Sequence, residues 1–209
     1  MTDGPHSIHN LQLLIDRLAK GDDQACAELI NHSARRLETL TSRMFRDYRR
    51  LGRWEETEDI CQNAAIRLWK ALKAAPPTTP AEFHRLAALQ IRRELIDLVR
   101  RHFGPEGIGT NHASNMDHDG SSTATPSPLH VAQSTNDPSK LSTWADFHEQ
   151  VAALPDDERA AFDLIWYQGL EQSEAAKILG ISERTLKRRW LAARLSLGRA
   201  LDGSTPFQD

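Results

Sequence analysis

Two stretches of the chain carry hydrophobic residues at intervals of three and four positions, the pattern of amphipathic α-helices. They cover residues 8–103 and 144–201. Between them, residues 104–143 are rich in Gly, Ser, Thr, Asn and Pro and have few large apolar side chains. Such a segment buries too little surface to offset its own ordering entropy. The pattern therefore predicts an all-α protein with two small helical domains, 8–103 and 144–201, joined by a flexible linker, 104–143.

Glycines, prolines and capping residues predict where the individual helices begin and end. In the first domain, the expected helices are residues 8–19, 24–51, 57–75 and 80–103. In the second domain, one helix is expected near Trp144 and another from Pro155 to Gly169, followed by helices at 173–179 and 183–201. No period-two alternation of apolar residues predicts a β-strand.

The composition narrows the classes of protein to consider. The chain has 209 residues and a net charge of −3, so any nucleic-acid surface must come from locally concentrated basic residues. It has two cysteines, Cys26 and Cys61, and lacks the close spacing of a zinc site or a disulfide framework. The N-terminal residues do not resemble a signal peptide, and no apolar run is long enough to span a membrane. We therefore expect a cytoplasmic protein with no metal, no cofactor and no membrane insertion.

The most specific motif lies between Gln172 and Trp190 and predicts a DNA-reading helix-turn-helix. Small residues, Ala175 and Ala176, allow two helices to cross closely. Gly180 can adopt the left-handed conformation that ends the first helix. Ser182 is a favourable N-cap for the second helix, whose residues advance by about 100° each.

This spacing separates the second helix of the motif into two faces. Leu186, Trp190, Ala193 and Leu197 fall on one stripe, and Arg184, Lys187, Arg188 and Arg194 fall on the opposite side. Cations on such a helix can neutralise phosphates and reach guanine edges in the major groove. A basic face is by itself also typical of an ordinary solvated helix, but the caps and small residues at fixed offsets favour DNA binding.

Two further helices have candidate surfaces. In helix 57–75, we expect Cys61, Ala65, Leu68, Trp69 and Leu72 in the core. Asp59, Asn63, Ile66 and Arg67 should face outward, as a protein contact or as plain surface. Helix 80–103 carries Arg85, Arg92, Arg93, Arg100 and Arg101, which suit either a nucleic-acid surface or intrahelical ion pairs.

Taken together, the two domains resemble the extracytoplasmic-function sigma factors, the minimal two-domain sigma factors of bacterial RNA polymerase. The segment from Glu58 to Trp69 resembles that family's clamp-binding helix, and helix 80–103 resembles its −10 region. Leu154-Pro155 and the helix-turn-helix resemble its −35 region. Near Gln90 and Arg92 the chain departs from the family's commoner pattern, which has an Asn there.

The resemblance implies a function and a set of residues for each region. The chain would bind core RNA polymerase and promoter DNA and direct transcription initiation, without being an enzyme. An anti-sigma factor is an implied further partner. The polymerase-binding residues would be Asp59, Gln62, Asn63, Ile66 and Arg67. The −10 residues would be Arg92, Arg93, Asp97, Arg100 and Arg101. The −35 residues would be Ser182, Arg184, Thr185, Lys187, Arg188 and Arg189.

Two other hypotheses compete with this one. A helix-turn-helix repressor or activator would use the first domain to dimerise and would bind duplex operators tightly without polymerase. An enzyme or scaffold is the third class. The clustered acids Glu55, Glu56, Glu58 and Asp59 are typical of helix capping rather than acid/base catalysis. No Walker or GxGxxG loop indicates a bound nucleotide.

Overall fold

The computed structural model describes residues 8–45, 54–103 and 138–201. The first part contains α1 (Ile8–Ala19), α2 (Asp23–Phe45), α3 (Trp54–Ala74) and α4 (Pro80–Phe103). The second part contains α6 (Pro138–Ala153), α7 (Asp156–Phe162), the π-helical turn η2 (Asp163–Tyr167), α8 (Gln172–Ile178) and α9 (Glu183–Ala200). These described residues include no strand, which confirms the expected all-α class.

One cluster of apolar side chains holds α1 to α4 together at one end of the molecule. Leu11 and Ile15 of α1 pack with Leu29 of α2, and this cluster extends to Leu72 of α3 and Phe83 of α4. All five are buried. Because α1 is short, this apolar stripe rather than intrinsic propensity keeps it helical.

The π-helical turn interrupts what the sequence predicts to be one regular helix between Pro155 and Gly169. The backbone N–H of Gln168 donates to the carbonyl of Asp163 at 3.0 Å, a five-residue step. Gly169 then ends the segment with φ of +67°. The wider turn leaves Asp163, Leu164, Trp166 and Tyr167 all buried.

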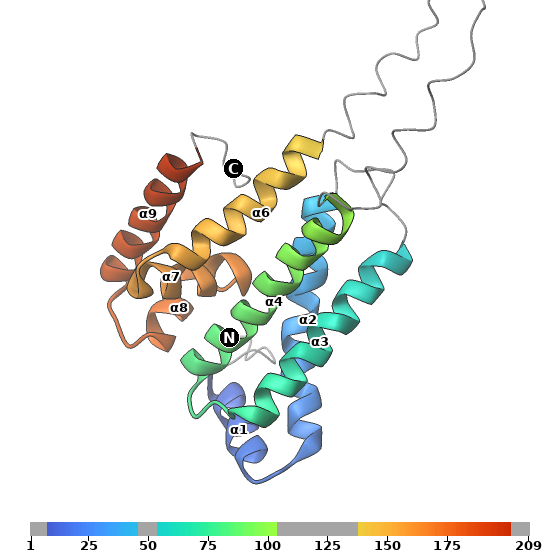
Figure 1. The fold of residues 1–209 in the computed structure, drawn as a ribbon. Helices are drawn as coiled ribbons and strands as arrows, with labels where there is room; N and C mark the ends of the chain where they lie inside the picture. The colour runs from blue at the N-terminus through green and yellow to red at the C-terminus, as the bar shows by residue number, and fades with distance from the viewer. Residues whose placement is uncertain (1–7, 46–53, 104–137, 202–209) are drawn as a thin grey trace, which may run out of the picture.

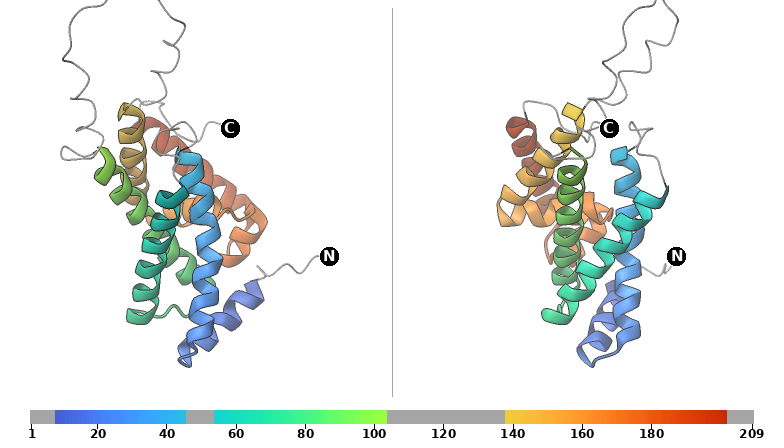
Figure 2. Two further views of the ribbon diagram at one scale, coloured as in Figure 1. Left: turned by 90° about the vertical axis from the view of Figure 1, so that its right-hand side faces the viewer. Right: turned by 45° about the vertical axis from the view of Figure 1, so that its right-hand side comes forward.

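Helix α4 of the first part packs against α3 on one side and against α6 of the second part on the other (Figure 1). The turned views in Figure 2 also place α6 alongside α4. A second apolar cluster is continuous across both parts. It joins Leu37, Ile60 and Leu95 of the first part to Phe147 and Trp166 of the second part. Through this shared cluster, the two parts of the described chain are docked against each other.

Most of the expected helix bounds agree with the structure to within a few residues, and two helices begin earlier than expected. Helix α3 begins at Trp54, and α6 begins at Pro138, so residues 138–143 of the expected linker are helical. The rest of the expected linker, 104–137, lies outside the described residues, as does the end of the predicted helix 24–51.

The predicted core face of α3 was partly wrong. Leu68 and Leu72 are buried as expected, but Trp69 is 48% exposed. Ile60 and Ala64 occupy the core in its place. The buried stripe is therefore rotated toward positions 60, 64, 68 and 72, which follow one another at the four-residue spacing of a helix face.

Candidate nucleic-acid interface

The helix-turn-helix forms as its sequence predicts. Gly180 has φ of +65°, and the backbone N–H of Ile181 donates to the carbonyl of Ala176 at 3.0 Å. Ser182 Oγ accepts a hydrogen bond from the backbone N–H of Thr185 at 3.2 Å, so the first turn of α9 is capped. Ala175 and Ala176 are buried where α8 meets α9. The turn therefore fixes the direction in which α9 leaves the domain.

Helix α9 presents a cationic face to solvent. Leu186, Ala193 and Leu197 are buried and Trp190 is partly buried, which confirms the predicted packing stripe. The side chains of Arg184, Lys187 and Arg188 are exposed. They lie in the first two turns of the helix, the part that a helix-turn-helix inserts into the major groove.

Two further cations of α9, Arg189 and Arg194, make contacts within the chain, as does Thr185. Arg189 forms an ion pair with Asp157 of α7 at 2.6 Å. The Arg194 guanidinium lies 6.0 Å from the centre of the Trp190 ring. The hydroxyl of Thr185 is 2.9 Å from that of Ser182. Arg189 and Thr185 are therefore less available to a ligand than the three exposed cations.

The outward face of α3 contains the residues expected to contact a partner protein. Asp59 and Gln62 are exposed, Asn63 is half-buried, and Ile66 is 44% exposed. Trp69 adds a second exposed apolar side chain one turn further along. An apolar pair with polar neighbours is the composition expected of a protein contact.

Arg67, also expected on this face, joins α3 to α4. Its guanidinium lies 3.0 Å from the Glu94 carboxylate and 2.6 Å from that of Asp97. Arg101 lies 2.7 Å from the other Glu94 oxygen. Glu94 is fully buried, and this burial raises the pKa of its carboxyl, although the two guanidinium groups oppose the shift.

An open groove of about 600 Å³ lies between α3 and α4. Its lining contains four cationic and two acidic side chains together with Asn63 and Ile66. These charged residues are Arg67, Lys70, Arg100 and Arg101, with Glu94 and Asp97. The groove thus brings together residues from the predicted polymerase-binding and −10 sets, which the sequence placed on separate helices.

The five residues of the −10 set have different environments on α4. Arg93 is exposed, and Arg101 and Asp97 lie in the groove. Arg100 forms an exposed ion pair with Glu149 of α6 at 2.7 Å. Arg92 is only 4% exposed and faces away from the groove, into the contact between the two parts of the molecule.

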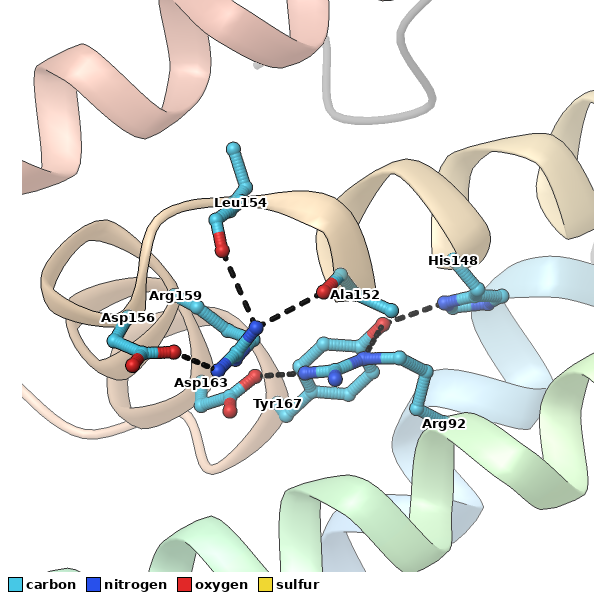
Figure 3. Close-up of polar contacts among 8 residues, drawn as sticks. All are labelled: Arg92, His148, Ala152, Leu154, Asp156, Arg159, Asp163 and Tyr167. Carbon is cyan, nitrogen blue, oxygen red and sulfur yellow. Dashed lines mark hydrogen bonds and ion pairs between the residues drawn. The ribbon is translucent and has the colours of Figure 1, made fainter.

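Figure 3 shows how Arg92 is held there. Its guanidinium forms an ion pair with Asp163 of η2, and its Nε donates to the hydroxyl of Tyr167 at 3.4 Å. The same hydroxyl lies 2.6 Å from Nδ1 of His148. In this arrangement Arg92 cannot contact DNA, which corrects the expectation that all five residues share one surface.

Burial shifts the ionisation of this cluster. It lowers the pKa of His148 to about 3, because a charged imidazole would lose its hydration beside the Arg92 cation. Desolvation also raises the pKa of Tyr167. It raises the pKa of Asp163 to about 6, since the lost hydration outweighs the attraction of Arg92.

A second arginine, Arg36 of α2, contacts the same turn. Its Nε donates to the Tyr167 carbonyl at 3.0 Å, and a terminal nitrogen donates to the Trp166 carbonyl at 2.5 Å. Sequence reasoning missed Arg36, His148, Asp163 and Tyr167 as members of the polar cluster around Arg92. Asp163 was the one possible sequence signal of this cluster. It is the single acid in the apolar run from Ala160 to Tyr167, and a buried carboxylate needs a partner.

The part of the chain that the structure describes contains neither a metal-binding cluster nor a membrane-spanning helix. No three potential ligands among its His, Cys, Asp and Glu side chains lie close enough to hold a metal ion. None of its helices combines the length and apolar character needed to cross a membrane.

Comparison with known proteins gives a consistent result over the length of the chain. The family model described as "ECF sigma factor" matches residues 8–203. The "ECF RNA polymerase sigma factor SigK" of Mycobacterium ulcerans is 25% identical over 204 residues, covering 98% of this chain and 100% of that protein. The protein of the same name from Mycobacterium tuberculosis is 28% identical over 209 residues, with the same coverage.

Solved structures are also similar. One of them is described as "Structure of CnrH in complex with the cytosolic domain of CnrY", with a TM-score of 0.36 and 19% sequence identity. The match covers 93% of this chain and 98% of that chain.

Proposed function

Because the chain belongs to the ECF sigma factor family, we propose that it binds core RNA polymerase through α3 and reads promoter DNA through α4 and α9. Promoter recognition and transcription initiation are the activity of this family. The family match, from residue 8 to residue 203, carries this assignment. In complex with the polymerase, the chain acts in the cytoplasm. It contributes promoter recognition and has no catalytic role of its own.

For the −35 element, we assign recognition to the first two turns of α9. Arg184, Lys187 and Arg188 are exposed there, on a helix whose start is capped by Ser182. Arginine and lysine side chains in the major groove can bind guanine edges, and each phosphate contact adds affinity by releasing counterions. Arg189 would join them only after leaving Asp157.

For core polymerase, we assign binding to the outward face of α3, formed by Asp59, Gln62, Asn63, Ile66 and Arg67. Exposed apolar side chains on a polar face support this assignment, because such residues dominate binding energy once they are desolvated. We assign recognition of the −10 element to α4. The residues are the exposed Arg93 and Arg100, together with Arg101 and Asp97 in the groove. An anti-sigma partner would bind by covering these same faces.

The polymerase assignment is tested by Ile66→Asp, with Leu13→Asp as the matched control. Both side chains are exposed apolar residues on helices of the first part, but Leu13 on α1 lies outside the proposed face. Ile66→Asp should weaken binding to core polymerase by tenfold or more, because it places a charge in a desolvated contact. Titration of labelled protein with core enzyme measures this. Equal affinities for the two variants would contradict the assignment.

The DNA assignment is tested by Arg184→Glu with Arg188→Glu. In transcription from genomic fragments with core polymerase, followed by mapping of transcript starts, this variant should lose specific starts while still binding the enzyme. Arg199→Glu, an exposed arginine in the last turn of α9, is the matched control and should keep them. A repressor or activator would instead bind duplex DNA tightly without polymerase, which gel-shift of the protein alone detects.

A further inference from the structure

Glu94 lines the groove between α3 and α4 but is fully buried, whereas the other charged residues of the groove are at least partly exposed. We infer that Glu94 is a positioning residue, whose carboxylate holds the Arg101 guanidinium in the groove in the orientation that binds a phosphate of promoter DNA. This inference rests on the proposed function, because it explains how a residue assigned to the −10 element is prepared for its ligand. Glu94 acts through Arg101 and does not itself touch the DNA.

The contacts of the two arginines beside Glu94 show which of them depends on it. Nη2 of Arg101 lies 2.7 Å from one Glu94 oxygen, and Nε of Arg101 donates to the carbonyl of Asp97 at 3.4 Å. Nε of Arg67 lies 3.0 Å from the other Glu94 oxygen, but Arg67 also pairs with the Asp97 carboxylate at 2.6 Å. Among the described residues, Arg101 therefore relies on a single carboxylate, whereas Arg67 has two.

Arg101 keeps a side open to an anionic ligand. Its Nη1 takes part in neither of these contacts, and its side chain is 52% exposed. Arginine binds phosphate through neighbouring N–H groups, and cationic side chains outnumber acidic ones in the groove. Because a long side chain loses rotamer freedom when it binds, an arginine that is already held in place binds its ligand at a lower entropic cost.

A buried carboxylate at this position contributes little to stability. Burial raises the pKa of the Glu94 carboxyl, and the guanidinium groups of Arg67 and Arg101 act against that shift. An apolar side chain of similar size would avoid the desolvation, and replacements of this kind in buried ion pairs are often neutral or stabilising. The contribution of Glu94 is therefore the orientation of its neighbours rather than the strength of the fold.

Glu94→Met tests the inference, because it removes both carboxylate oxygens and keeps an unbranched side chain of similar length. If Glu94 contributed only its charge, its loss would leave the groove more positive and strengthen DNA binding. If it positions Arg101, the complex of the full chain with core RNA polymerase should bind promoter fragments roughly tenfold more weakly. The slope of log affinity against log salt concentration should become shallower by about one, the contribution of one phosphate contact. Affinity for core polymerase should stay close to that of the wild type.

Asp23→Asn is the matched control. It also removes a carboxylate from an ion pair between two helices, that of Asp23 on α2 with Lys73 on α3, but outside the groove. It should leave the salt dependence of promoter binding unchanged. Arg101→Ala completes a double-mutant cycle with Glu94→Met. Alone, it should make the salt dependence shallower by about one, and in combination with Glu94→Met it should change nothing further.

Far-UV circular dichroism checks that the variants keep their helices. If Glu94→Met loses them, Glu94→Asp takes its place, because it retains the charge but is one methylene group too short to reach both arginines. Glu94→Asp should show the same shallower salt dependence, and a wild-type slope in this variant overturns the inference.

The outcomes separate the two proposals. Unchanged or tighter promoter binding by Glu94→Met, or additive effects of Glu94→Met and Arg101→Ala, overturns the positioning role and leaves the sigma-factor assignment intact. Failure of the wild-type protein to bind core polymerase overturns the proposed function, and the positioning role with it.

Discussion

At the scale of single residues, Gly169 and Gly180 share a backbone conformation but should differ in how much an added side chain destabilises the protein. Both have positive φ, +67° and +65°, which disfavours any side chain. At Gly180, nothing lies within 4 Å of the position that a Cβ would occupy. At Gly169, that Cβ would lie 2.8 Å from the guanidinium carbon of Arg36. Arg36 cannot simply move aside, because it is bonded to the Trp166 and Tyr167 carbonyls.

We therefore predict that Gly169→Ala is more destabilising than Gly180→Ala. The strain of positive φ should cost about 1–2 kcal/mol in each variant. In Gly169→Ala, loss of the Arg36 hydrogen bonds should cost about 1.5–3 kcal/mol more. Unfolding in urea, followed by circular dichroism, measures both free energies. Equal losses would show that Arg36 adapts without leaving the carbonyls.

At the scale of elements, the N-cap of α9 determines where the helix begins, and its buried side chains determine the direction in which it runs. Ser182 provides the cap, and Leu186 provides the first buried contact. Exposure of the cations follows from these two features, because the buried stripe leaves only the opposite face free for solvent. The π-helical turn differs, because its groups are satisfied by other helices. Arg36 of α2 binds its carbonyls, and Arg92 of α4 pairs with its buried Asp163.

Ser182→Ala should lower the free energy of unfolding by about 1 kcal/mol, because the backbone N–H of Thr185 loses its acceptor. Ser182→Asp, which retains a capping oxygen, should stay within a few tenths of a kcal/mol of the wild type. Urea unfolding of the two variants in parallel measures the difference. An equally large loss with Asp would indicate that the hydroxyl acts through something other than the cap.

At the scale of the whole molecule, the buried histidines couple stability to pH. Burial lowers the pKa of His148 to about 3 and that of His84 to about 4, from the ordinary 6.5. Below pH 6.5 the unfolded chain therefore binds protons that the folded chain does not, and the free energy of unfolding decreases as the pH is lowered. Asp163 acts in the opposite sense below about pH 6, because its raised pKa lets the folded chain bind a proton first.

His148→Gln isolates one of these contributions. Between about pH 6 and pH 4, its free energy of unfolding should fall less steeply than that of the wild type, by about 1.4 kcal/mol per pH unit. The amide side chain can still accept a hydrogen bond from the Tyr167 hydroxyl. Urea unfolding at several pH values gives both slopes. Parallel profiles would show that His148 is not held neutral in the folded protein.

Features set by neighbouring residues were within reach of the sequence. Helical periodicity, the glycine and serine at the helix-turn-helix and the cationic face of α9 all depend on residues within a few positions of one another. The likeness of the motifs to a known family added the expected partners. For these features the expected residues, from Ala175 to Leu197, lie where the sequence placed them.

On α3 and α4, tertiary structure alone decided the environment of individual residues. Trp69 and Arg92 both lie on helices that the sequence predicted, yet the tryptophan is exposed and the arginine is buried. Arg92 pairs with Asp163, 71 positions away, and no local pattern encodes such a contact. The sequence determined the helices and their charges, whereas burial depends on which helices meet. The docking of α6 and η2 onto α4 therefore decided the environment of Arg92.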